Sequence, residues 1–328
     1  MIKDQDTSLR KYVLRRVLQA IPLVIAVIVF TFMMIHLFPG DIIYLIAGEG
    51  GSAEYYDFMR HAYGLDKPIY DQFVIYLTKI LQGDLGNSLY FNQPVVTVVG
   101  ERIPATLLLM ISQFTIASIL GVLLGLLAAS RPGSKTDGSV IVLSLFWYSI
   151  PVFWSGQMLL YVFSLRLGLF PTEGMVSLTG DVSGFGYVLS VLRHLALPAV
   201  SLALHNVALL ARVTRSSALE ALREDYIVTA LAKGVKERTI VFTHAFRNAL
   251  LPVTTIIGLH LGVLFTGAVL TETVFSWPGI GRLTYDSISR RDYPVLIGIF
   301  IVVAVSVIIA NLLTDILYAK LDPRVRYK

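Results

Sequence analysis

The feature that most constrains this chain is a series of long apolar stretches without Asp, Glu, Lys or Arg. Five such stretches cover 17–37, 103–129, 139–165, 252–271 and 295–314. A helix needs about 20 apolar residues to cross the hydrocarbon of a bilayer. Charged residues make up 15% of the chain, against roughly 25% in soluble domains. The sequence therefore predicts an all-α integral membrane protein, because helices satisfy their own backbone groups in lipid.

The apolar pattern favours six transmembrane helices. They are expected at about 13–37, 104–129, 139–165, 194–213, 252–275 and 295–318. The fourth is the least apolar, because His194, His205 and Asn206 interrupt it. The first apolar run is about 20 residues long and ends in FPGD without a small-residue cleavage site. It is therefore expected to remain as a membrane span.

Small residues and prolines predict local features of these spans. G-x-x-x-G pairs occur at 121–125 and 258–262, and such pairs allow helix backbones to approach closely. Pro151 and Pro198 remove backbone hydrogen bonds and are expected to kink their helices. Among the connections, 38–103 is expected to hold short helices, with YDFMRHAYGL and YDQFVIYLTKIL as candidates. Residues 130–138 are expected to form a tight turn, and 166–193 a loop with at most a short surface helix.

The distribution of basic residues predicts the orientation. With the N-terminus inside, 18 of the 27 Lys and Arg residues fall in cytoplasmic segments and nine in outer ones. Membrane proteins concentrate Lys and Arg in their cytoplasmic loops. Both termini and the 214–251 stretch are therefore expected in the cytoplasm. The net charge of +5 is accounted for by this topology, so we expect no nucleic-acid partner.

The polar stretch 214–251 separates two apolar spans and holds ten charged residues, so it must protrude into water. Within it, an expected helix carries a small apolar face at i, i+1, i+4 and i+5. The face consists of Tyr226, Ile227, Ala230 and Leu231. A short helix of this kind outside the membrane is typical of a docking element. The alternative is an amphipathic loop that packs on its own bundle.

The boundaries of these helices follow from capping residues. Ser216 or Ser217 is expected to N-cap a helix that runs to about Lys233. Gly234 is the expected residue after its C-cap, because glycine adopts the left-handed conformation freely. A second helix is expected over 236–252, where the proline marks its boundary.

Several chemistries are disfavoured by what the sequence lacks. The chain has no cysteine and no G-x-x-x-x-G-K-[ST] motif, so it offers no thiolate metal site and no P-loop. It also lacks the H-E-x-x-H motif of zinc proteases. Proton-coupled carriers need ionisable groups inside their spans. Only His205 and His260 lie well inside, without an acidic neighbour on the same span.

At the polar stretch the sequence resembles a known family. The run DYIVTALAKGVKERTIVFTHAFRNALLP resembles the cytoplasmic coupling segment of ABC-importer permeases for dipeptides, oligopeptides and nickel. Similar motifs of that subfamily occur in order along nearly the whole chain: FPGD, YGLDKP, GDLGNS, ERIPATL, ETVFSWPGIGRLTYDSISRRDYP and NLLTDILYAKLDPRVRY. One departure from the wider ABC-permease pattern is the spacing of eighteen residues from Gly234 to Pro252, where thirteen is usual. The peptide subfamily shows this longer spacing, which narrows the assignment.

The resemblance implies a type I ABC importer permease fold and a set of partners. These are a homologous second permease, two P-loop ATPase subunits, an extracytoplasmic substrate-binding protein and membrane lipid. This chain would be non-catalytic and hold no cofactor, while the ATPase subunits bind ATP and magnesium. The implied coupling residues are Asp225, Tyr226, Thr229, Ala230, Ala232, Lys233, Gly234 and Arg247.

The expected layout has a cytoplasmic N-terminus at 1–12 and a first span at 13–37, followed by an extracytoplasmic segment at 38–103. A permease core at 104–318 and a cytoplasmic tail at 319–328 complete it. Polar, uncharged residues of the spans are candidates for lining the translocation path: Gln113, Ser149, Gln157, Asn206, Thr255 and His260.

The expected function is import of dipeptides or oligopeptides through the cytoplasmic membrane of a prokaryote, by alternating access driven by the ATPase subunits. A nickel chelate or another small solute is a second candidate cargo. A stand-alone channel, a secondary carrier or a structural membrane scaffold would also fit a chain with several apolar spans. Genes for P-loop ATPases next to this one would favour the importer.

Overall fold

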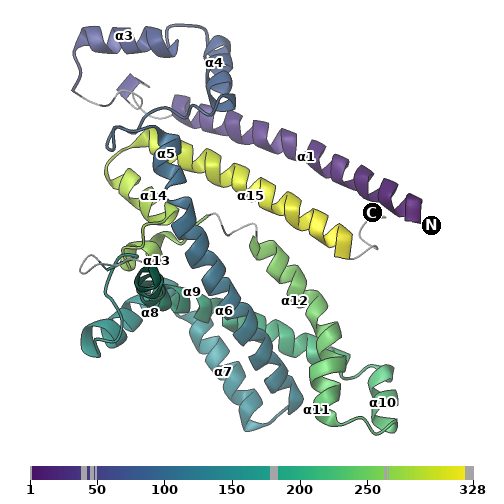
Figure 1. The fold of residues 1–328 in the computed structure, drawn as a ribbon. Helices are drawn as coiled ribbons and strands as arrows, with labels where there is room; N and C mark the ends of the chain where they lie inside the picture. Colours follow the sequence, from purple (N-terminus) through teal and green to yellow (C-terminus); the bar gives the residue numbers. More distant parts are fainter. Residues whose placement is uncertain are drawn as a thin grey trace. The chain divides into compact units, whose positions relative to one another are not determined.

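The computed structural model describes residues 2–37, 43–44, 48, 50–177, 184–261, 264 and 266–321 (Figure 1). Within this described part every regular element is a helix, and one isolated β-bridge joins Asn87 to Pro94. The all-α prediction is confirmed. The chain divides into two compact units, which are taken separately below. Unit 1 comprises Met1–Pro104, Leu261–Val269 and Gly279–Lys328, and unit 2 comprises Ala105–His260 and Leu270–Pro278.

Unit 1 is built on two long helices that pack side by side, α1 and α15 (Figure 1). Its helices are α1 (Ile2–Leu37), α3 (Ala53–Tyr63), α4 (Ile69–Leu81), α5 (Val95–Gly100), α14 (Ile280–Ser289) and α15 (Tyr293–Leu321). Helix α1 starts eleven residues before the expected first span. A buried apolar cluster joins α5, α14 and α15 and includes Val95, Ile280 and Val295.

The segment 38–103 holds both expected helices, as α3 and α4. Ser52 caps α3, since its hydroxyl accepts a hydrogen bond from the Tyr55 amide at 3.2 Å, and Gly64 ends the helix in the left-handed conformation. Helix α5 is a third short helix in this segment, of the two or three expected, and its position was not predicted. The loop before α5 is fixed by the buried Asp292, whose carboxylate accepts hydrogen bonds from the Ser88 hydroxyl at 2.5 Å and the Tyr90 amide at 3.2 Å.

Unit 2 holds most of α6 and the helices from α7 to α12. They are α6 (Ile103–Ser130), α7 (Lys135–Ser149), α8 (Val152–Leu159), η1 (Leu160–Arg166), α9 (Gly184–Ala221), α10 (Asp225–Ala232), α11 (Glu237–Thr239), η2 (Ile240–Ala245) and α12 (Phe246–Leu261). Helix α13 (Val269–Val274) begins at the last residue of a unit 1 segment. The elements η1 and η2 are π-helical. Helices α7 and α8 both pack on α9.

The first G-x-x-x-G pair gives the close helix contact that was expected. A Cβ on Gly121 would lie 2.6 Å from the Cβ of Leu210, and a Cβ on Gly125 would lie 2.6 Å from the carbonyl oxygen of Ala211. Both distances are too short for a side chain, so glycine lets α6 and α9 approach within this chain. The second pair cannot be compared, because Gly262 lies outside the described residues.

Four helices in the described part are long and apolar enough to cross a membrane: Val13–Leu37, Val95–Ser130, Gly184–Ala221 and Tyr293–Ile316. They correspond to the expected first, second, fourth and sixth spans. The fourth is much longer than predicted, and it includes residues 184–193, which were expected to be loop. It also continues past Pro198, so whether this proline kinks the helix stays a prediction.

The expected third span is not one straight helix. Helices α7 and α8 with η1 are together long and apolar enough to cross a membrane, but they are bent by 101° at Ile150 and Pro151. The bend at Pro151 was predicted, and its cause is that proline disfavours helical backbone in the residue before it. Ile150 is accordingly extended, at φ −81° and ψ 132°.

The expected fifth span, 252–275, is wrong as a single helix. Helix α12 begins earlier, at Phe246, and ends at Leu261, and the short α13 starts only at Val269. Between them Gly267 adopts the left-handed conformation at φ +70°, which does not belong to a helix. The predicted tail 319–328 lies mostly outside the described residues.

Candidate functional site

The polar stretch 214–251 folds as a short helix, α10, between two longer helical arms (Figure 1). The first expected boundary is wrong, because no new helix begins at Ser216 or Ser217. Helix α9 continues through both serines to Ala221. The serines do not cap a helix, because the next turn of α9 packs through the buried Ala218 and Ala221 and this packing stabilises the longer helix. Helix α10 starts only at Asp225, after a turn at 222–224.

The end of α10 follows the glycine rule that the sequence predicted. Gly234 has φ +75°, its amide donates to the Leu231 carbonyl at 2.9 Å, and the Val235 amide donates to the Ala230 carbonyl at 3.1 Å. These two hydrogen bonds define a Schellman motif, in which the residue after the C-cap must take a left-handed conformation. The second arm then begins at Glu237, as expected, but continues through Pro252 to Leu261.

Helix α10 has one face packed against its own chain. Ile227 and Ala230 are buried in a cluster with Ile240 of η2, and Leu222 and Val235 pack against the same cluster. The sequence predicted a docking face that included Ile227 and Ala230, with packing on the chain's own bundle as the alternative. For these two residues the alternative is correct, because residues at i and i+3 share one helix face and this face packs on η2.

The other face of α10 stays open in this chain. Val228 and Leu231, three residues apart on this face, are 61% and 54% exposed, while Tyr226, on a different side of the helix, is 37% exposed. Charged side chains border this face, and those of Arg223, Glu224, Asp225, Lys233, Lys236 and Glu237 are exposed. An apolar patch with a charged rim on a short protruding helix has the composition of a protein contact surface.

Tyr226 also ties α10 to the second arm. Its hydroxyl accepts a hydrogen bond from the Asn248 side-chain amide at 2.6 Å, which links α10 to α12. Together with the buried cluster, this bond holds α10 at two points. Asn248 and Ile240 were missed at the sequence level. A polar Asn in the run FRNALLP, between a basic residue and an apolar segment, was the available signal for Asn248.

The structure places seven of the eight expected coupling residues at the surface. Ala230 is buried, and the exposed ones are Asp225, Tyr226, Thr229, Ala232, Lys233, Gly234 and Arg247. The Thr229 hydroxyl donates back to the Asp225 carbonyl at 3.1 Å, within α10 itself.

Two of the expected path-lining residues come together. The Asn206 side-chain amide on α9 donates to the Gln113 side-chain oxygen on α6 at 3.0 Å, and Gln113 is buried. This pair bonds two helices inside unit 2, a common use of amides in membrane proteins. Ser149 and Gln157 are exposed, and Ser149 donates to the Leu145 carbonyl on its own helix at 2.8 Å.

The last two expected path-lining residues, Thr255 and His260, have side chains outside the described residues. Among the four that are described, on α6, α7, α8 and α9, a hydrogen bond joins Gln113 to Asn206. A role for any of the six in lining a path stays a prediction.

Comparison with known proteins gives the family. Residues 121–327 match the family described as binding-protein-dependent transport system inner membrane component. Residues 9–110 match the family described as binding-protein-dependent transport system membrane component, N-terminal. The two matches do not overlap and together cover most of the chain.

Three relatives are similar over nearly their whole length. The chain is 42% identical to the di/tripeptide transport system permease protein DppB of Pseudomonas aeruginosa (strain UCBPP-PA14), covering 97% of this chain and 99% of that protein. It is 40% identical to the dipeptide transport system permease protein DppB of Escherichia coli (strain K12), with the same coverage. It is also 40% identical to the oligopeptide transport system permease protein AppB of Bacillus subtilis (strain 168), covering 96% and 99%.

The family match and the three relatives agree with the succession of apolar helices described above. The chain therefore belongs to the family of inner membrane components of binding-protein-dependent transport systems, and it is a multi-pass membrane protein.

Proposed function

We propose that this chain is the permease subunit of an ATP-binding-cassette importer for dipeptides and oligopeptides, and that α10 is its contact with a separate ATPase. The observation that carries the proposal is the two-sided packing of α10. Ile227 and Ala230 fix it to η2, while Val228 and Leu231 remain open to a partner. The relatives named above transport di-, tri- and oligopeptides, which supports the cargo.

The mechanism assigned to this chain is mechanical and not chemical. The sequence has no P-loop, so ATP and its magnesium ion would bind to two partner ATPase subunits. Closure of those subunits would displace α10. Because α10 is short and held at both ends, its displacement would pass to α9 and to α12. The spans would then switch between inward-open and outward-open packing, which is alternating access by rigid-body motion.

The remaining partners follow from the same proposal. A homologous second permease would complete the passage, surrounded by membrane lipid, and an extracytoplasmic binding protein would deliver the peptide. Both termini and α10 would face the cytoplasm, as the excess of Lys and Arg in those segments indicates. The spans of this chain carry few charges that could bind a zwitterion tightly, so selection of the peptide is assigned to the binding protein.

Uptake by a reconstituted complex tests this function. The complex, with its second permease and ATPase subunits, is placed in proteoliposomes that hold ATP on the ATPase side and the binding protein on the other. We expect uptake of a radiolabelled dipeptide that requires both ATP and the binding protein. A nickel chelate offered in parallel tests the second candidate cargo. Dipeptide uptake without ATP would contradict the proposal, and uptake of the chelate alone would contradict its cargo.

A further inference from the structure

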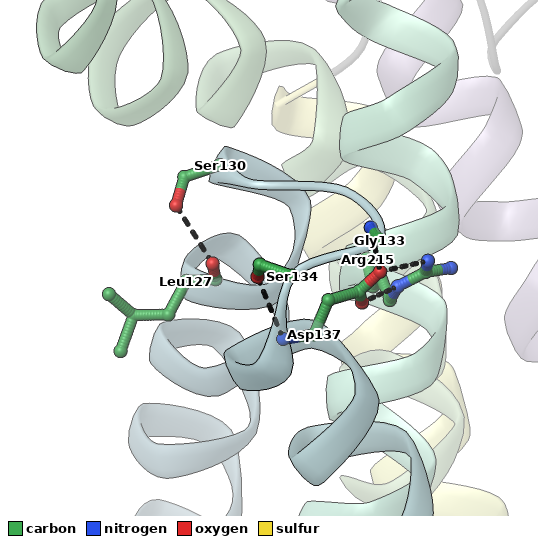
Figure 2. A network of polar contacts seen from close by, with 6 residues as sticks. All are labelled: Leu127, Ser130, Gly133, Ser134, Asp137 and Arg215. Carbon is green, nitrogen blue, oxygen red and sulfur yellow. Dashed lines mark hydrogen bonds and ion pairs between the residues drawn. The ribbon is translucent and has the colours of Figure 1, made fainter.

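Asp137, in the first turn of α7, forms an ion pair with Arg215 of α9 (Figure 2). The Arg215 Nε donates to Asp137 Oδ1 at 2.5 Å, and Nη2 donates to Oδ2 at 2.8 Å. This is the bidentate geometry in which two parallel hydrogen bonds fix the angle as well as the distance between two groups. The pair therefore sets how the start of α7 is oriented on α9.

Asp137 is held in place by its own turn. Its carboxylate also accepts a hydrogen bond from the Gly133 amide at 2.9 Å, and its amide donates to the Ser134 hydroxyl at 3.2 Å (Figure 2). Ser134 is the N-cap of α7, so the neighbouring residues Gly133 and Ser134 position the carboxylate and the start of the helix together. The Asp137 side chain is only 4% exposed, so its charge is almost fully withdrawn from water.

A buried pair of this kind is not a simple source of stability. The Arg215 side chain stays 26% exposed, but withdrawing the Asp137 charge from water costs about as much as its attraction to Arg215 returns, and apolar residues of similar size often stabilise a fold equally well. Apolar contacts, however, resist sliding less than a bidentate pair does, because they have no preferred direction. The pair is therefore suited to hold α7 and α9 in a fixed relative position when a force acts on one of them.

The position of Arg215 indicates that such a force would come from α10. It lies six residues before the end of α9, about 9 Å along the helix axis, and α10 follows after the short turn at 222–224. In the same part of the molecule Gly125 of α6 lies against Ala211 and Thr214 of α9 with no room for a side chain. Helices α6, α7 and α9 are thus locked together next to the point where the chain leaves for α10.

We propose that Asp137 and Arg215 are positioning residues that pass the movement of α10 from α9 to the α6–α7 turn. This inference rests on the proposed function, because it requires that an ATPase moves α10. Without the pair, α9 would follow α10 while the start of α7 slipped, and ATP would be hydrolysed with less peptide imported.

The test measures peptide imported per ATP hydrolysed in the reconstituted complex. Asp137→Asn keeps the size of the side chain but removes its charge, and Arg215→Lys keeps the charge but removes the bidentate fork. Because either change could leave a buried group unpaired, the decisive variant is the double change of Asp137→Asn with Arg215→Gln, which removes both charges. The matched control is Asp286→Asn, which breaks the more exposed Arg282–Asp286 pair of α14, 3.9 Å apart.

For the neutral double variant we expect normal membrane insertion, normal recovery with the ATPase, and about a tenfold lower ratio of peptide to ATP, a typical size for coupling between two sites. Arg215→Lys should fall between this variant and the wild type, and Asp286→Asn should match the wild type. A wild-type ratio in the double variant would overturn the inference, and so would its loss from the membrane, since the pair would then be structural. Absence of ATP-dependent uptake in the wild type would instead contradict the proposed function.

Discussion

At the scale of single residues, Gly234 has the strictest requirement in the polar stretch. Its φ of +75° lies in the left-handed region, and a Cβ added there would meet nothing within 4 Å beyond its two chain neighbours. A substitution at this position therefore strains the backbone but meets no steric clash with a neighbour. This separates the effect of conformation from that of packing.

We expect Gly234→Val to destabilise the end of α10 by roughly 1–3 kcal/mol, because a β-branched residue strongly disfavours positive φ. Gly234→Asn is the matched control, since asparagine tolerates the left-handed region best after glycine. Binding-protein-stimulated ATP hydrolysis of the complex is the measurement. It should fall in the valine variant and stay near the wild-type rate in the asparagine variant. A wild-type rate of ATP hydrolysis in both variants would show that the left-handed turn is not needed for coupling.

At the scale of one element, neighbouring residues of α10 have opposite environments, one buried and one exposed. Ala230 is buried against Ile227 and Ile240, while Leu231 is more than half exposed. A charge at the first position must enter the chain's own cluster, whereas a charge at the second meets water until a partner binds. Two adjacent substitutions therefore separate folding of α10 from its docking.

We expect Ala230→Glu to unfold α10 locally, because a buried unpaired charge costs about 3–5 kcal/mol. Leu231→Glu should leave α10 folded and prevent the ATPase from binding. Protease cleavage within 222–236 reports the folding, and recovery of the ATPase with the purified permease reports the docking. Both variants should lose the ATPase, but only Ala230→Glu should become sensitive to protease. Retention of the ATPase by Leu231→Glu would contradict the assignment of the exposed face.

The sequence predicts some of these features because their causes are local. A left-handed Gly234 and a bend at Pro151 follow from the backbone preferences of glycine and proline alone. The extension of α9 past Ser216 depends on the packing of Ala218 with distant residues of α6 and α12, and the burial of Ala230 depends on its contact with Ile240. Capping rules include neither contact. The Gln113–Asn206 bond joins residues 93 positions apart, so the polar character of both was visible but their pairing was not.

At the scale of the whole molecule, the distribution of Lys and Arg gives a topology that the arrangement of helices does not test by itself. The chain has no cysteine, so single introduced thiols are unambiguous probes. Lys236 in the polar stretch and Lys67 between α3 and α4 are both exposed, and the proposed topology places them on opposite sides of the membrane.

We expect a membrane-impermeant maleimide to label Lys67→Cys in intact spheroplasts and to label Lys236→Cys only after the membrane is opened. The physical reason is that basic residues are retained on the cytoplasmic side, where 18 of the 27 Lys and Arg residues are placed. Labelling of Lys236→Cys from outside intact spheroplasts would reverse the topology and exclude a cytoplasmic ATPase at α10.

The central claim is that the exposed face of α10 contacts an ATPase subunit, and site-specific cross-linking tests it most directly. A photoreactive maleimide is attached to Val228→Cys of the permease before the ATPase is added, and Gly138→Cys of α7, where a Cβ has open space, serves as a control. The account predicts that illumination joins the Val228→Cys chain to the P-loop ATPase and leaves the Gly138→Cys chain unattached to it. An assembled, ATP-hydrolysing complex without any ATPase adduct at Val228→Cys would contradict it.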